Sequence, residues 1–314
     1  AFDWKTRKNW QKGSKTEGSL AIHFKQAFHG RSGYTLSLTN TSDPRKYQYF
    51  PLFDWPRIIN PKLFFPITDE NLQETIKNEQ LALLQIEQAI VANPDKVSCI
   101  IIEVIQAEGG DNHFRDEFFV ELRRICDEND ILLIFDEVQT GIGITGKMWA
   151  YQNFSVIPDV ISFGKKAQVC GILANKEKLD QVEHHVFAEN SRINSTFGGN
   201  FIDMLRFQLV LEIIEKENLL ENVQKQGAFL LEGLQKLQEE YPHLISNARG
   251  RGLMCAFDLS DTKMRNDFQE KLYEENIIIL ICGDQSLRFR PHLNVTQEDL
   301  QIALNKIDEI ASQL

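Results

Sequence analysis

The stretch LLIFDEVQTGIGITGKM, residues 132–148, joins an apolar segment to two acids and a glycine-rich loop. Its first four residues, 132–135, are all apolar, as expected of a short strand that is covered on both faces of a sheet. Two similar runs flank it along the chain, VSCIIIEVI at 97–105 and DVISFGK at 159–165. Intervening segments of helical length make these runs typical of parallel strands. The sequence therefore predicts an α/β fold built on a mostly parallel sheet.

Further elements are expected on the N-terminal side of these strands. The segments 19–24 and 33–39 are predicted to be strands, and 41–66, which is rich in proline and aromatic residues, is predicted to be irregular. Leucine, isoleucine and alanine recur at helical spacing over 69–93, and a second helix is expected around 115–129. Both helices lie between predicted strands, as a parallel sheet requires.

The pattern of predicted helices and strands changes in the last third of the sequence. Amphipathic helical patterning, with one brief break, continues up to Tyr241. Strands are then expected at 252–260 and 276–282, followed by a loop or short strand at 286–293. The last element is predicted to be a helix with Thr296 as its N-cap. This order of elements is typical of a smaller α+β unit.

This change in the pattern of predicted elements indicates two domains. We expect a large domain over residues 1–212 and a small C-terminal α+β domain over 213–314. The chain opens on AFDWKTRKNW, which has no Met and resembles a helix that is already under way. We therefore expect that an N-terminal part of the large domain is missing from this sequence.

The composition of the chain argues against several classes of binding partner. The formal net charge of −11 argues against a general binder of nucleic acid or of anionic membranes, since both need a basic face. No apolar run approaches the ~18–20 residues that span a bilayer, and no signal peptide is recognisable. The five cysteines are scattered and form no C-x-x-C, which favours reduced thiols in a cytoplasmic protein. No histidine pair has metal-binding spacing, so we expect no metal site.

The glycine-rich loop at first suggests a nucleotide hydrolase. Residues 141–147 fit the pattern G-x-x-x-x-G-K, and acids precede them at the end of a strand. However, Met148 stands where a serine or threonine must bind magnesium. Lys147 would also share one turn with Asp136 and could not reach across a bound nucleotide. The P-loop interpretation is therefore set aside.

An acid and an amine are expected at one edge of the sheet. Asp136 ends one predicted strand, and Lys165 and Lys166 end the next one along the chain. In open α/β sheets this edge lines the ligand crevice. An acid that faces a ring nitrogen, together with a partly desolvated lysine that attacks an aldehyde, is the arrangement that pyridoxal phosphate requires. Taken singly, Asp136 could be an N-cap or ion-pair partner and the two lysines a solvated turn.

Seven motifs in one order resemble the class III (fold-type I) aminotransferases. They cover almost the whole chain, which implies the fold of that family and pyridoxal 5′-phosphate as cofactor. The motifs are AFHGRSGYTLSLT (27–39), EVIQAEGG (103–110), FDEVQTGIGITG (135–146), PDVISFGKK (158–166), STFGGN (195–200), RGRGLM (249–254) and RFRPHL (288–293).

The resemblance implies a set of cofactor-binding residues. Lys165, which follows Gly164, would form the Schiff base and then act as the catalytic base and acid. Asp136 would keep the ring nitrogen protonated, and Gln139 would hydrogen-bond the ring hydroxyl. Phe28 would stack on the ring. Thr196 would reach the phosphate of the cofactor in the neighbouring subunit, which implies a homodimer.

Three further stretches, 40–58, 126–141 and 191–200, are similar to those family members that transfer the ε-amino group of L-lysine to 2-oxoglutarate. The expected products are L-glutamate and 2-aminoadipate 6-semialdehyde, which cyclises to a piperideine carboxylate. Two different substrates must then share one pocket, a problem suited to bidentate arginine–carboxylate pairing.

The resemblance also implies how the carboxylates of the two substrates are bound. Arg31 would bind the distal carboxylate of either substrate, and Arg288 the α-carboxylate of glutamate. Glu108 would pair with Arg288 while lysine is bound, because a buried unpaired arginine is costly.

Two alternatives remain open from the sequence. The chain could be another ω-aminotransferase of the same family, one that acts on ornithine or 4-aminobutyrate. It could also be a truncated, non-catalytic relative, because the family's phosphate-binding loop is expected in the part that precedes residue 1.

Overall fold

The computed structural model describes residues 1–314 and contains two sheets. The larger has six strands in the order β2-β1-β3-β4-β5-β6, and all neighbours are parallel except β5 and β6. The predicted mostly parallel α/β sheet is thereby confirmed. The strands are β1 (Leu20–Phe24), β2 (Arg57–Ile58), β3 (Val97–Glu103), β4 (Leu132–Asp136), β5 (Val160–Phe163) and β6 (Gly171–Ala174).

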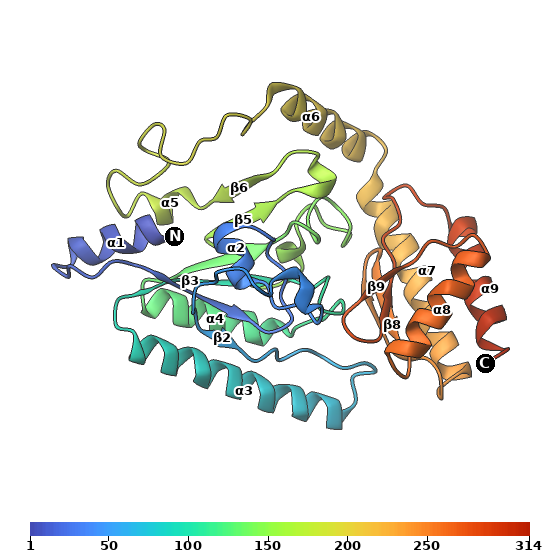
Figure 1. Ribbon diagram of the computed structural model, residues 1–314. Coiled ribbons are helices and arrows are strands. Elements are labelled where there is room, and N and C mark those ends of the chain that lie inside the picture. Colours follow the sequence, from blue (N-terminus) through green and yellow to red (C-terminus); the bar gives the residue numbers. More distant parts are fainter.

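Both faces of this sheet are covered, which explains its apolar strands. On one face lie α3 (Asp69–Ala92) and α4 (Asp116–Glu128), and on the other lies α1 (Phe2–Gln11) (Figure 1). Alternate residues of β3 enter different cores: Ile100 packs on the α4 side and Cys99 on the α1 side, with Trp4. The strands therefore show continuous apolar runs and no alternation.

A C-terminal unit follows, and it supplies most of a core of 26 buried residues that also includes Ile105, Ala107 and Ile144 of the large unit. Its antiparallel sheet has the order β7-β8-β10-β9. The predicted division after residue 212 falls inside α6, the helix that leads into this unit (Figure 1). The elements are α6 (Phe201–Lys216), α7 (Leu219–Glu240), β7 (Ser246–Arg251), β8 (Met254–Asp258), α8 (Thr262–Glu274), β9 (Leu280–Cys282), β10 (Ser286–Arg288) and α9 (Gln297–Ala311).

Local capping explains where the last helix begins. The side chain of Thr296 accepts a hydrogen bond from the backbone N–H of Asp299, and the side chain of Asp299 accepts one from the backbone N–H of Thr296. This reciprocal pair satisfies two otherwise unpaired donors. The predicted N-cap is confirmed.

The prediction of a strand at 33–39 is wrong. Residues Gly33–Leu38 form the short helix α2. Strand β1, which precedes it, already has β2 and β3 on its two sides, so no free edge remains beside it for another strand. As a helix, the segment returns Thr39 to the loop after β1, where its Oγ1 accepts hydrogen bonds from the N–H groups of His29 and Gly30.

Three strands were not predicted. Strand β2 has only two residues and lies within the segment 41–66 that was predicted to be irregular. Strand β6 has only four residues and lies at the sheet edge, and β7 has the polar sequence SNARGR. The side chain of Arg249 in β7 is nonetheless buried and forms an ion pair with Asp258 at 2.8 Å. Such a strand is stabilised by tertiary partners that its own sequence does not reveal. None of the helices is long and apolar enough to span a membrane.

Candidate active site

The carboxyl ends of three neighbouring strands converge on one buried acid. Glu103, Asp136 and Ser162 lie side by side in register on β3, β4 and β5. Asp136 is 6% exposed, and its Oδ1 accepts hydrogen bonds from Val138 N at 3.1 Å and Ser162 Oγ at 3.0 Å. These two donors hold the carboxylate of Asp136 in one orientation.

His29 lies on the other side of Asp136 and was not predicted. Its Nδ1 lies 2.8 Å from Asp136 Oδ2, and its side chain is 1% exposed. Burial acts to lower the pKa of His29, but the hydrogen bond to Asp136 and the charge of that residue outweigh it, so the pKa is raised. The motif FHG shows a histidine beside the expected ring-stacking residue, but no spacing in the sequence links it to residue 136.

Glu103 is a second buried acid that was not predicted. It accepts hydrogen bonds from Phe28 N at 2.8 Å and Ala107 N at 3.1 Å. Burial raises the pKa of Glu103 to about 7, although the charge of His29 opposes this shift. Glu103 therefore fixes the loops that carry Phe28 and Glu108. The rule that acids at strand ends line the crevice could have found it.

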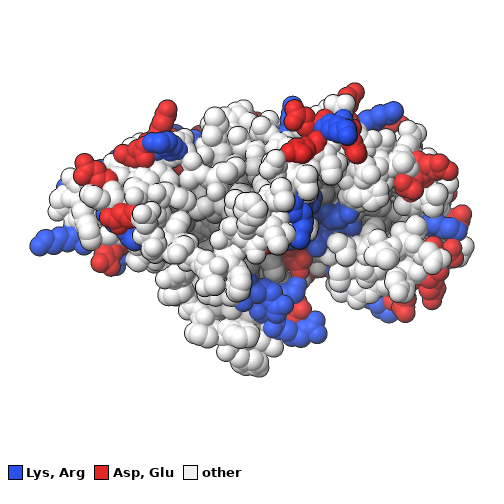
Figure 2. All heavy atoms as spheres, turned by 90° about the horizontal axis from the view of Figure 1, so that it is seen from above, with Lys and Arg blue, Asp and Glu red and all other residues white.

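These groups open onto a cavity of about 340 Å³. Seven of the eight predicted site residues line it, and Thr196 is the exception. Seen from above, lysine and arginine side chains gather around a recess between the two units (Figure 2). The predicted residues in the cavity are Phe28, Arg31, Glu108, Asp136, Gln139, Lys165 and Arg288.

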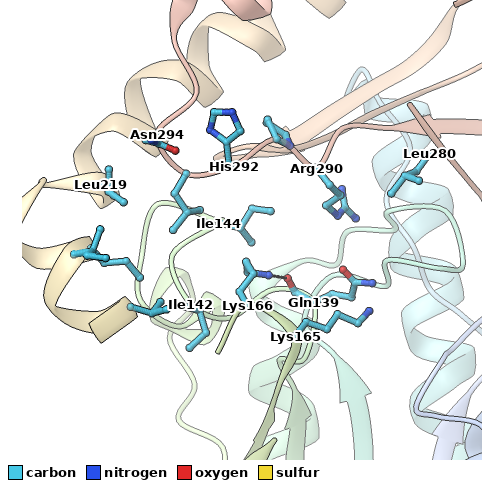
Figure 3. Close-up of a pocket in the computed structure, with 15 residues that line it drawn as sticks. Gln139, Ile142, Ile144, Lys165, Lys166, Leu219, Leu280, Arg290, His292 and Asn294 are labelled. Atoms are coloured by element: carbon cyan, nitrogen blue, oxygen red, sulfur yellow. Dashed lines mark hydrogen bonds between the residues drawn. The ribbon is translucent and has the colours of Figure 1, made fainter. Parts of the chain in front are cut away.

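The structure separates the two adjacent lysines. Lys165 lines the cavity with Asp136 and also a neighbouring cavity of about 710 Å³, and its amine makes no hydrogen bond or ion pair. Lys166 lines only the neighbouring cavity, and it donates a hydrogen bond to the backbone oxygen of Gln139 at 2.6 Å (Figure 3). Partial burial and then the positive charge of Arg288 lower the pKa of Lys165. Burial, followed by the charge of Arg290, lowers the pKa of Lys166 to about 7.

Arg288 ends β10 and is incompletely paired. Its Nη2 lies 3.4 Å from Glu108 Oε2, while its Nε and Nη1 are buried without a hydrogen-bond partner. The predicted proximity of Arg288 and Glu108 is thus present. Glu108 has a second cationic partner that was not predicted, since its Oε1 contacts Lys46 Nζ. Buried N–H groups without acceptors are costly, so this arginine suits an additional anion.

The two remaining predicted residues are exposed. Arg31 lines the cavity, yet it forms no ion pair within the chain. Thr196 is exposed in the segment before α6 and lies outside the cavity. The chain therefore brings together every predicted side chain except the one that was expected to act across subunits.

The loop that carries Glu108 is attached to the C-terminal unit. Gly283 N donates to the backbone oxygen of Glu108 at 2.8 Å. Arg249 donates to the backbone oxygens of Gly110 and Asp111, and Arg290 pairs with the carboxylate of Asp111. These contacts come from β7, from the turn after β9 and from the segment after β10, and together they fix the loop against that unit.

The chain is similar to known proteins both in sequence and in structure. Residues 1–311 match the family described as aminotransferase class III. The L-lysine-epsilon aminotransferase of Mycobacterium tuberculosis is 47% identical over 305 residues, which cover 97% of this chain and 67% of the relative. That of Amycolatopsis lactamdurans is 45% identical over 98% of this chain and 68% of the relative. A solved lysine aminotransferase from M. tuberculosis matches with a TM-score of 0.94 and 45% identity, over 98% of this chain and 70% of that one.

Proposed function

Because this chain belongs to the class III aminotransferase family, we propose that it transfers the ε-amino group of L-lysine to 2-oxoglutarate. The products are 2-aminoadipate 6-semialdehyde, which cyclises to a piperideine carboxylate, and L-glutamate. The observation that carries the proposal is Arg288, whose one paired nitrogen is covered by Glu108 and whose other two have no partner. Such an arginine suits a pocket in which one substrate brings a carboxylate and the other does not.

Enzymes of this family depend on pyridoxal 5′-phosphate, and the residues around the cavity fit that cofactor. Asp136 is a buried anion that can face a ring nitrogen, and Lys165 has an amine with no partner. When bound, the cofactor supplies an electron-withdrawing ring that accepts electron density as a C–H bond next to nitrogen breaks.

Each residue that contacts the cofactor, or orients one that does, has a defined role in this proposal. Lys165 attaches the cofactor and, once substrate has displaced it, moves a proton between two carbon atoms. Asp136 holds a proton on the ring nitrogen, while His29 and Ser162 fix the orientation of its carboxylate. The side chain of Gln139 binds the ring hydroxyl, and Phe28 packs against the ring.

Substrate binding rests on three charged residues. Arg31 binds the carboxylate farthest from the transferred amino group, which is the α-carboxylate of lysine or the γ-carboxylate of glutamate. Arg288 binds the α-carboxylate of glutamate or 2-oxoglutarate. Glu108 covers Arg288 when lysine is present, since lysine has no second carboxylate.

The purified protein, loaded with cofactor, tests the function with a panel of amino donors and 2-oxoglutarate as acceptor. L-Lysine should be converted more efficiently than L-ornithine or 4-aminobutyrate, with one glutamate formed for each lysine consumed. Mass spectrometry of the cyclised product identifies the amino group that was transferred. Failure to convert L-lysine overturns the proposal, and preference for ornithine or 4-aminobutyrate reassigns the substrate.

The substitution Glu108→Gln should separate the two half-reactions. With lysine, Arg288 then lies uncovered in the cavity, and kcat/KM for the lysine half-reaction should fall about ten-fold. The glutamate half-reaction should stay within about two-fold, because its α-carboxylate covers Arg288. Single-turnover absorbance of the cofactor measures both rates.

A matched control for this substitution is Glu121→Gln, which removes a half-buried glutamate outside the cavity that is also paired with an arginine, Arg124. It should change neither rate. Equal losses in both half-reactions of Glu108→Gln would show that Glu108 does not discriminate between the substrates.

We also propose that the working enzyme is a cytoplasmic homodimer in which Thr196 binds the cofactor phosphate of the other subunit. Thr196 is exposed, and neighbouring apolar residues such as Phe197 and Phe201 are exposed as well, at 83% and 79%. Burial of such side chains favours association. The five free cysteines support a reducing compartment. Sedimentation velocity should give the mass of a dimer at micromolar protein, and a monomer would contradict this proposal.

A further inference from the structure

Lys46 is a cavity residue with no part in the mechanism so far. It is the last residue of a 3-10 turn, η1 (Pro44–Lys46), within the irregular segment that precedes β2. Its Nζ contacts Glu108 Oε1 and lies 5.9 Å from the centroid of the Phe28 ring. Its side chain is only 26% exposed, so this contact is partly shielded from solvent.

Glu108 faces a conflict when the acceptor binds. The α-carboxylate of 2-oxoglutarate must replace Glu108 on Arg288, which brings two negative charges to one guanidinium. Glu108 cannot move away as a whole, because its backbone oxygen accepts from Gly283 N at 2.8 Å. Its side chain must therefore find another cation. Within the chain, only Lys46 and Arg288 form ion pairs with Glu108.

We propose that Lys46 is a positioning residue that determines specificity for the acceptor: it holds Glu108 while a substrate carboxylate occupies Arg288. This inference rests on the proposed function, in which Glu108 alternates between covering and releasing Arg288. Oε1 of Glu108 already contacts Lys46 while Oε2 faces Arg288. Glu108 can therefore leave Arg288 by rotation of its own side chain, and its contact with Lys46 is kept during that rotation.

The substitution Lys46→Ala should therefore weaken the acceptor side alone. Without Lys46, Glu108 pairs only with Arg288 and competes with the α-carboxylate, so KM for 2-oxoglutarate should rise about ten-fold while kcat changes little. The lysine half-reaction, in which Glu108 stays on Arg288, should remain within about two-fold. Lys46→Arg should restore most of the affinity, because it restores the cation.

Arg45→Ala is the matched control. It removes a cation from the same turn, but Arg45 is 82% exposed and pairs with Asp43, not with Glu108. Its KM for 2-oxoglutarate should equal that of the unaltered enzyme. An equal rise of KM in this control would show that general positive charge, and not the contact with Glu108, attracts the acceptor.

A double-mutant cycle with Glu108→Gln decides whether Lys46 acts through Glu108. In the Glu108→Gln background, Lys46→Ala should leave the KM for 2-oxoglutarate unchanged. Calorimetric titration of the holoenzyme with glutarate, a dicarboxylate that cannot react, should show the same pattern in Kd. A ten-fold rise in both backgrounds would mean that Lys46 contacts the substrate directly, and no rise in either would also overturn the proposal. Both results differ from failure of the proposed function, in which the unaltered enzyme does not convert L-lysine.

Discussion

Replacing Lys165 by alanine should stop transamination, with a loss in turnover of about 10⁴-fold, whereas Lys166→Ala should retain turnover within about ten-fold of the unaltered enzyme. The reason is geometric. Lys165 lines the cavity that contains Asp136 and its amine has no partner, whereas Lys166 is bound to the backbone of Gln139 and lines only the neighbouring cavity. The pKa is lowered for both lysines, so the contacts of the two amines, and not their pKa, distinguish them.

The two lysine variants control for each other, since each removes one amine from the same turn. Borohydride reduction followed by peptide mass spectrometry should locate the cofactor on Lys165 in the unaltered protein and in Lys166→Ala. The visible absorbance of the attached cofactor should disappear in Lys165→Ala. Cofactor attached to Lys166, or an unchanged spectrum in Lys165→Ala, would refute the assignment.

The substitution Asp136→Asn should reduce turnover about 10³-fold. Asparagine has the same shape and keeps an oxygen that can accept from Val138 N and Ser162 Oγ, so the local fold should survive. It lacks the negative charge that keeps a proton on the ring nitrogen of the cofactor. It also leaves His29 without its anionic partner.

Single-turnover rates with lysine, together with the dissociation constant of the cofactor, measure the effect of Asp136→Asn. Ser162→Ala serves as the control, because it removes one hydrogen bond to Asp136 and leaves the charge in place; its loss should stay below about ten-fold. A rate for Asp136→Asn within ten-fold of the unaltered enzyme would show that the charge of Asp136 is not required.

The central strands could be predicted because burial on both faces leaves a mark in the sequence itself. Runs such as the one at 97–105 have no alternation, and only a doubly covered strand explains this. The short helix α2 and the polar strand β7 could not be predicted, because their state depends on partners elsewhere in the fold. Strand β7 is stabilised by pairing with β8 and by the buried ion pair of Arg249, neither of which its local pattern indicates.

The residues of the candidate site also divide into those that strand order predicts and those that it does not. Asp136 and Lys165 were found because both end strands of one sheet, so topology alone brings them together. Glu108 and Arg288 were found through the family resemblance. Lys46 was missed because it is 62 residues from Glu108 and lies in an irregular segment, where neither periodicity nor strand order predicts a neighbour.

The Glu108 loop is attached to both units, and this couples two properties of the pocket. Gly283, Arg249 and Arg290 hold the loop to the unit that also carries Arg288, while Glu103 and Lys46 hold it to the large unit. Arg31 lies in the loop between β1 and α2 of the large unit. A rotation between the units would therefore change the distance from Arg31 to Arg288, and with it the chain length of the dicarboxylate that fits. The same rotation would load the contacts that hold Glu108 beside Arg288, so substrate length and the covering of Arg288 are set by one interface.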